Sequence, residues 1–150
     1  MNIRKAYNFK EVNPQLSCSG MLRKVNLQSL SEEGYEVVIN LLPDDSEYAV
    51  EGEKAAFEKS GIYYVHIPVD WDEPKQSEFE TFESELKAVE GKKVHIHCAA
   101  NFRVTAFYAI YAFRNQDWSI TELSEFIGSI WQLSEYPVWD KFVSAYIYKI

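Results

Sequence analysis

The segment from Val94 to Thr105 reads VHIHCAANFRVT and carries the strongest structural signal in the chain. Its first four residues are too few for a helix and are apolar at alternate positions, which predicts a short central strand. The residues from Phe102 to Phe113 are dense in apolar and aromatic side chains and are numerous enough for a buried helix. Cys98 is therefore expected where a strand ends and a helix begins.

Apolar runs and helical stretches alternate around this segment from about residue 35 onward, which is typical of parallel strands joined by crossover helices. The other strands are predicted near residues 9–12, 16–19, 37–42 and 62–67. Further helices are predicted at residues 22–30, 51–59, 77–89, 119–131 and 138–148, the fourth with a capping box between Ser119 and Glu122. We therefore expect an α/β fold, a short and mostly parallel sheet of about four or five strands flanked by helices, with the cysteine turn at its carboxyl edge.

Length and composition indicate one ordinary globular domain spanning residues 1–150. Hydrophobic residues make up 47% of the chain and charged residues 25%, which excludes disorder as the main state. No apolar run approaches the roughly 20 residues that span a bilayer, and the first residues lack the apolar stretch of a secretory signal. We expect a soluble, cytoplasmic protein with no membrane partner.

Charge and cysteine content exclude further classes of protein. Asp and Glu total 23 against 15 Lys and Arg, and the resulting net charge of -8 repels a phosphate backbone, so nucleic acid is not expected as a partner. The two cysteines, Cys18 and Cys98, form no closely spaced pair, which excludes a disulfide framework or a zinc finger. No cofactor motif and no metal site are predicted.

The position of Cys98 favours reactivity. Backbone N–H groups at a strand-to-helix turn attract an anion, and helix N-termini can lower a thiol pKa from about 8.5 into the range of roughly 3.5–7.5. Arg103 adds a planar guanidinium that suits two phosphate oxygens. The alternative is a buried structural cysteine, since free Cys is among the most buried residue types. The close spacing of Cys98 and Arg103 favours phosphoryl transfer through a cysteinyl-phosphate.

At these residues the chain resembles a known family. His97-Cys98, followed after a loop by Thr105, resembles the phosphate loop of protein tyrosine and dual-specificity phosphatases, whose pattern is H-C, five residues, Arg, then Ser or Thr. Upstream segments follow the order found in a small group of bacterial phosphatase-like proteins, formerly a domain of unknown function and related to the beta-lactamase hydrolase-like phosphatases. These segments are Ser19-Gly20, residues 34–42, Ile67-Pro68-Val69 and Asp70-Trp71-Asp72. The resemblance covers about residues 8 to 115.

The resemblance implies a phosphatase that acts on a phosphorylated protein or a small aryl phosphate. Cys98 would be the nucleophile, the Thr105 hydroxyl would assist the leaving thiolate, and His97 would hold the thiolate from the strand. A phosphate or sulfate anion would be held at the loop by the backbone N–H groups of residues 99 to 104, namely Ala99, Ala100, Asn101, Phe102, Arg103 and Val104. No role is assigned to His66 or His95.

The loop departs from the family pattern at two positions. Asn101 replaces the usual Gly, and Asn tolerates a left-handed backbone next best. Val104 stands where the family has Arg, so Arg103 is one place early. With a loop of the usual length, Arg103 must reach the phosphate from a neighbouring direction; with a loop one residue shorter, Arg103 fits but Thr105 does not.

The shorter spacing between cysteine and arginine also raises two alternative functions. Sulfurtransferases of the rhodanese type have such a loop, whose smaller ring of N–H groups suits a persulfide. The acidic loop after Val69 favours the phosphatase, because sulfur transfer does not need it. A phosphate-binding relative with little turnover is the other alternative.

A phosphate ester needs a proton donor at its leaving oxygen, and the loop after the strand at 62–67 offers carboxyl groups. Asp70 and Asp72 flank Trp71 there, at the sheet edge where Cys98 is expected. We prefer Asp72, because Trp71 and Pro74 could pin the loop around it, with Asp70 next. The alternative is a solvated acidic turn.

Two features outside the loop allow more than one interpretation. The aromatic residues near the C-terminus favour core packing over a ligand site, and a homodimer contact is expected if part of this group is exposed. Cys18 is expected to be a packed thiol, with a protective disulfide to Cys98 as the alternative.

Overall fold

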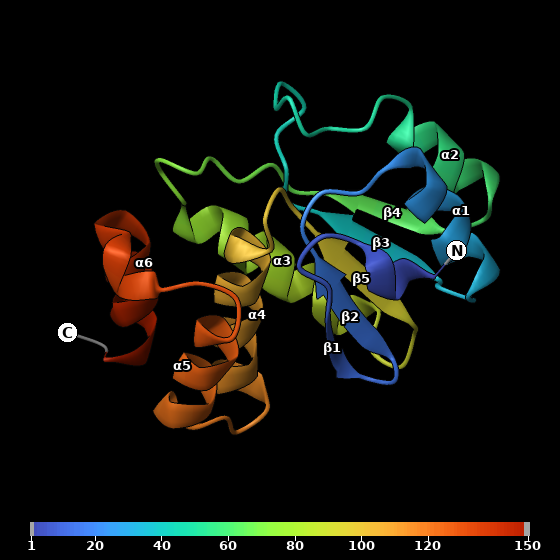
Figure 1. Ribbon diagram of the computed structural model, residues 1–150. Coiled ribbons are helices and arrows are strands. Elements are labelled where there is room, and N and C mark those ends of the chain that lie inside the picture. Colours follow the sequence, from blue (N-terminus) through green and yellow to red (C-terminus); the bar gives the residue numbers. More distant parts are fainter. Residues whose placement is uncertain (1, 149–150) are drawn as a thin grey trace.

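The computed structural model describes residues 2–148 and centres on a five-stranded sheet with the strand order β1-β2-β5-β3-β4 (Figure 1). Only the pair formed by β1 and β2 is antiparallel, and the other neighbours are parallel. The strands are β1 (Lys10–Asn13), β2 (Leu16–Ser19), β3 (Val37–Asn40), β4 (Tyr63–His66) and β5 (Val94–His97). The expected α/β fold with a short, mostly parallel sheet is confirmed, and β5 is the central strand.

Within residues 2–148, six α-helices surround this sheet. They are α1 (Lys24–Glu32), α2 (Glu53–Lys59), α3 (Gln76–Ala88), α4 (Phe102–Asn115), α5 (Ile120–Gly128) and α6 (Pro137–Ile147), and two 3-10 turns lie at Ile3–Lys5 and Leu133–Glu135. Helices α5 and α6 pack on α4. In Figure 1, α1 and α2 lie on the side of the sheet opposite α4 and α5. None of the helices within residues 2–148 is long and apolar enough to cross a membrane.

Alternate residues of β3 show how the sheet divides the core. Val38 packs in a smaller apolar cluster that also contains Leu30 of α1 and Phe57 of α2. Val37 and Ile39 point into the larger cluster, which includes side chains of α3, α4, α5 and α6. Both faces of the strand are therefore buried, as expected for a parallel sheet covered by helices.

The capping box that was predicted at the start of α5 is present. The Glu122 N–H donates to the Ser119 hydroxyl at 3.1 Å, and the Ser119 N–H donates to the Glu122 carboxylate at 3.0 Å. The helix ends at Gly128, before the expected end at residue 131. Trp131 instead turns into the core, where its indole N–H donates to the Thr105 hydroxyl at 2.9 Å. The helix therefore stops short of the end that its apolar pattern predicts, because Trp131 packs in the core instead of continuing the helix.

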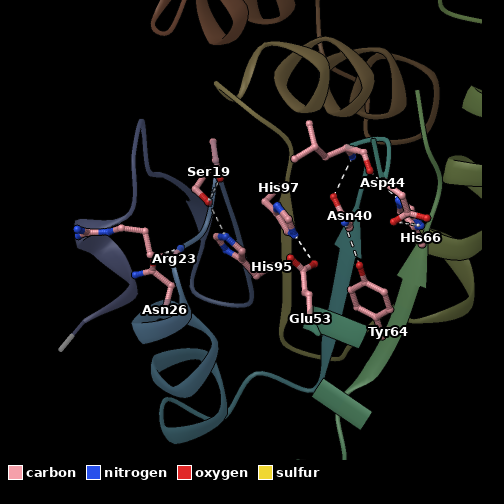
Figure 2. Close-up of polar contacts among 12 residues, drawn as sticks. Ser19, Arg23, Asn26, Asn40, Asp44, Glu53, Tyr64, His66, His95 and His97 are labelled. Carbon is pink, nitrogen blue, oxygen red and sulfur yellow. Dashed lines mark hydrogen bonds and ion pairs between the residues drawn. The ribbon is translucent and has the colours of Figure 1, made fainter. Parts of the chain in front are cut away.

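His95 lies in the centre of the sheet and has no solvent exposure. Its two ring nitrogens are 2.8 Å from the hydroxyls of Ser17 and Ser19, and the contact with Ser19 is drawn in Figure 2. Burial, together with the neighbouring His97, holds the pKa of His95 well below its ordinary value of 6.5. The folded protein therefore keeps this ring neutral where the unfolded chain would protonate it.

This difference predicts an acid-dependent loss of stability. Below pH 6.5 the unfolded state binds a proton at His95 that the folded state excludes, so the free energy of unfolding falls by up to about 1.4 kcal/mol per pH unit. Denaturant unfolding from pH 8 to pH 5 should show this fall in the wild type and a smaller one in His95→Gln, whose amide can still bond both serines. An equal fall in the free energy of unfolding for the two proteins would contradict the neutral state of His95 in the folded protein.

Candidate active site

The Cys98 loop connects β5 to α4 at the carboxyl edge of the sheet. Asn101 has φ 68° and ψ 14°, the left-handed conformation expected of it, and its side chain has no solvent exposure. Its amide donates to the Asn8 carbonyl at 2.9 Å and to the Cys18 sulfur at 3.5 Å, while the Asn8 amide donates to the Ala100 carbonyl at 3.0 Å. These bonds attach the loop to the N-terminal segment and to β2.

Gly20 allows this close packing. A Cβ at this position would lie 2.6 Å from the Ala99 carbonyl oxygen and 2.9 Å from the Ala100 Cα. The next residue, Met21, donates its N–H to the same Ala99 oxygen at 2.7 Å. The Ser19-Gly20 pair, which is part of the family resemblance, thus supports the loop from outside through backbone contact that a side chain would prevent.

The backbone of the loop leaves a group of N–H donors free. The Cys98 N–H donates to the Ser19 carbonyl at 3.3 Å, and the Thr105 N–H donates to the Asn101 carbonyl at 3.2 Å. Within residues 2–148, the N–H groups of residues 99 to 104 have no acceptor. Free N–H groups before and in the first turn of a 14-residue helix favour a bound anion.

A cavity of about 260 Å³ opens onto this loop. Cys98 is only 1% exposed and contributes to its lining, together with Arg103. The other lining residues are Trp71, Ala99, Ala100, Phe102 and Tyr136. The fold thus brings the predicted nucleophile and the displaced arginine into one cavity.

The Arg103 guanidinium lies over the Trp71 ring, 5.6 Å from its centroid. Its buried Nε has no hydrogen-bond partner, and no carboxylate within residues 2–148 forms an ion pair with it. An arginine that is half-buried and unpaired is costly unless an anion compensates its charge.

The two candidate proton donors lie at different places. Asp70 lines a second hollow of about 400 Å³ together with Arg103. Asp72 is exposed and lines neither hollow, and its backbone N–H donates to the Asp70 carboxylate at 2.9 Å. Trp71 anchors this loop, because its carbonyl accepts the Trp139 indole N–H at 2.8 Å and its ring packs on that of Trp139. The expected anchoring by Trp71 is present, and of the two aspartates only Asp70 shares a hollow with Arg103.

Thr105 and Val104 lie inside the protein, each with no solvent exposure. The Thr105 hydroxyl is 2.7 Å from the Asn101 carbonyl and accepts the Trp131 indole N–H. Within the described residues it has no hydrogen bond to Cys98. The structure therefore gives this hydroxyl partners that hold the loop, and it places the Val104 side chain in the core.

Both cysteines are free thiols, as expected of Cys18. Burial raises the pKa of Cys18 to about 12, and the Asn101 amide partly offsets this rise. Cys18 is thus a packed, unreactive thiol beneath the loop.

Several site residues carried no local signal in the sequence. Tyr136 was assigned to core packing, yet it also lines the Cys98 cavity. Glu53, which belongs to α2, forms a buried hydrogen bond with His97, with 2.7 Å between a carboxylate oxygen and Nε2. Both are distant from Cys98 in the chain, and their positions depend on how the helices pack. Within residues 2–148, no group of three or more His, Cys, Asp or Glu side chains is arranged to hold a metal ion.

The fold and loop place the chain in the class of protein tyrosine phosphatase-like α/β domains. A sequence model described as "Beta-lactamase hydrolase-like protein, phosphatase-like domain" matches residues 8–113, and the chain belongs to this family. The chain is 28% identical over 102 residues to the Beta-lactamase hydrolase-like protein of Agrobacterium fabrum (strain C58 / ATCC 33970), a match that covers 66% of this chain and 23% of that protein. It therefore spans less than a quarter of that relative.

Solved structures agree with this assignment. A DUF442 protein from Shewanella putrefaciens CN-32 is 31% identical, with a TM-score of 0.89 and coverage of 98% of this chain and 93% of that one. TpbA of P. aeruginosa, in a structure with pTyr, shares the fold at 19% identity, with a TM-score of 0.72 and coverage of 91% and 82%. These similarities support a phosphatase.

Proposed function

We propose that the domain hydrolyses phosphomonoesters through a cysteinyl-phosphate on Cys98. The observation that carries this proposal is the set of unpaired N–H groups at residues 99 to 104, which surround a cavity shared by Cys98 and the unpaired Arg103. These groups would bind the phosphoryl oxygens and the negative charge that develops on them.

The reaction would take place in two steps. The Cys98 thiolate attacks phosphorus, the S–P bond forms as the bond to the leaving oxygen breaks, and a carboxylic acid gives that oxygen its proton. Water then attacks phosphorus, the S–P bond breaks, and the carboxylate takes a proton from the water. The products are an alcohol or phenol, inorganic phosphate and the regenerated thiolate.

The cavity walls support an aromatic leaving group. Trp71, Phe102 and Tyr136 line the cavity beside Cys98. Trp71 and Tyr136 meet edge to face with their ring centroids 5.4 Å apart, a geometry in which a further ring can pack. A phosphorylated protein carrying phosphotyrosine, or a small aryl phosphate, is therefore the proposed substrate class.

The position of Asp70 supports it as the proton donor. Asp70 and Arg103 line the same hollow, whereas Asp72 does not line it and donates its backbone N–H to the Asp70 carboxylate. The sequence alone favoured Asp72, so the two residues form a matched pair for testing.

Replacement of the nucleophile tests the mechanism directly. Cys98→Ser should abolish phosphate release from p-nitrophenyl phosphate and leave tungstate binding largely intact, because a serine hydroxyl is not ionised at neutral pH. Cys18→Ser, at the other thiol, should retain most of the rate. Wild-type turnover by Cys98→Ser would exclude the mechanism, and formation of thiocyanate from thiosulfate and cyanide would favour a sulfurtransferase.

Arg103 should contribute about 10²–10³ in rate if its guanidinium reaches the phosphoryl oxygens. Arg103→Ala should lose that amount, and Arg103→Lys should recover only part of it, because an ammonium cannot bond two oxygens at once. The exchange of Arg103→Val with Val104→Arg should not help, since Val104 has no solvent exposure and the new guanidinium would be buried. Steady-state rates of these variants on one aryl phosphate show whether the guanidinium reaches the phosphoryl oxygens. A loss in rate below about tenfold in Arg103→Ala would indicate a phosphate-binding relative with little turnover.

The two aspartates should differ in their dependence on the leaving group. Asp70→Asn should slow hydrolysis of esters with basic leaving groups about 10²–10⁴-fold and affect p-nitrophenyl phosphate less, because acid catalysis matters most where the leaving oxygen is basic. Asp72→Asn should have the smaller effect. The reverse order, measured on a series of aryl phosphates, would restore Asp72 as the acid, and no effect from either would leave the loop as solvated surface.

A further inference from the structure

Glu53 and His97 form a hydrogen bond inside the protein, at the base of the Cys98 loop. Glu53 is the first residue of α2, and His97 is the last residue of β5, directly before Cys98. The carboxylate oxygen is 2.7 Å from the imidazole Nε2, and the side chains are 5% and 2% exposed (Figure 2). The fold therefore brings a carboxylate into contact with the residue that directly precedes the nucleophile.

A buried carboxylate has lost its hydration, so its burial costs free energy unless a nearby group compensates its charge. Besides His97, the Glu53 carboxylate interacts with the Tyr64 hydroxyl of β4. Burial and this carboxylate both raise the Tyr64 pKa, so the phenol remains neutral beside Glu53. His97 is thus the only basic partner of this carboxylate within the described residues.

Glu53 is also the only hydrogen-bond partner of the His97 ring within residues 2–148. The other ring nitrogen, Nδ1, is buried and has no partner. The His97 carbonyl accepts the Leu41 N–H at 2.9 Å, which fixes the backbone of the residue but leaves its ring orientation to Glu53. Loss of the carboxylate would release the ring of the residue that directly precedes Cys98 in the chain.

We propose that Glu53 is a positioning residue, which holds the His97 imidazole through their 2.7 Å hydrogen bond so that the imidazole stabilises the Cys98 thiolate. An influence of Glu53 on turnover rests on the proposed phosphatase function. Its influence on the ionisation of the Cys98 thiol does not. The titratable groups that interact with the pair are Tyr64 of β4, at Glu53, and His95 of β5, at His97. Asp44 also acts on Tyr64, and Cys18 of β2 interacts with Cys98.

The direction in which loss of Glu53 moves the pH at which Cys98 reacts shows whether Glu53 acts through His97 or directly through its own charge. Removal of a negative charge acting through space would favour the thiolate and lower the pH at which Cys98 reacts. Loss of Glu53 acting through His97 would instead weaken the support that the imidazole gives to the thiolate, and it would raise that pH. The two effects have opposite directions.

The test measures the rate of iodoacetamide alkylation of Cys98 against pH, with peptide mapping to separate it from Cys18. Glu53→Gln should raise the pH midpoint by about one unit, so that alkylation well below the midpoint falls about tenfold. Glu58→Gln is the matched control, since Glu58 is an exposed residue of α2 that lines the same cavity of about 860 Å³ as Glu53. Its midpoint should stay at the wild-type value.

A second comparison shows whether Glu53 acts through His97. His97→Gln should raise the midpoint as well, and the double variant Glu53→Gln with His97→Gln should move it no further than His97→Gln alone. Glu53→Asp, which keeps the charge but shortens the side chain, should raise the midpoint by less and serves if Glu53→Gln does not fold. An unchanged or lowered midpoint in the folded Glu53 variants, or additive shifts in the double variant, would overturn the proposal. A raised midpoint in a protein without phosphatase activity would refute the proposed function alone.

Discussion

The structure depends on a loop that must stay rigid while its own N–H groups remain unpaired. Free backbone donors at residues 99 to 104 would ordinarily bond water or collapse onto a nearby acceptor. Here the loop is held through its carbonyl groups. The Met21 N–H donates to the Ala99 carbonyl, and the Asn8 side-chain amide donates to the Ala100 carbonyl. The loop is thus attached through its acceptors, which leaves its donors available to an anion. Gly20 and the left-handed Asn101 make this division possible.

The same loop lies within a strongly acidic protein. The net charge of -8 repels an anionic substrate at long range, whereas the N–H groups and Arg103 attract it at contact. Solvent and salt screen the first effect, and the second acts in a cavity from which water is partly excluded. The local arrangement can therefore prevail over the global charge for a small anion.

Sequence patterns predicted the elements that form locally. The alternation in β5, the apolar run of α4 and the capping box of α5 each depend on neighbouring residues, and each was found near its expected bounds. The position of Cys98 at the sheet edge followed from the same patterns. The contacts that complete the site depend on tertiary packing instead. Glu53 meets His97, and Tyr136 reaches the Cys98 cavity, only because the helices pack as they do, so no spacing in the chain could indicate either.

The aromatic wall of the cavity has a consequence for how related proteins can differ. The family match ends at residue 113, whereas Tyr136 and the two tryptophans that pack on Trp71, Trp131 and Trp139, come later in the chain. Trp71 and Phe102 of the cavity wall lie inside the matched segment, whereas Tyr136 lies outside it. A relative that shares only the matched segment would therefore need other side chains to complete the wall beside its cysteine. This part of the cavity can thus vary between relatives while the loop stays the same.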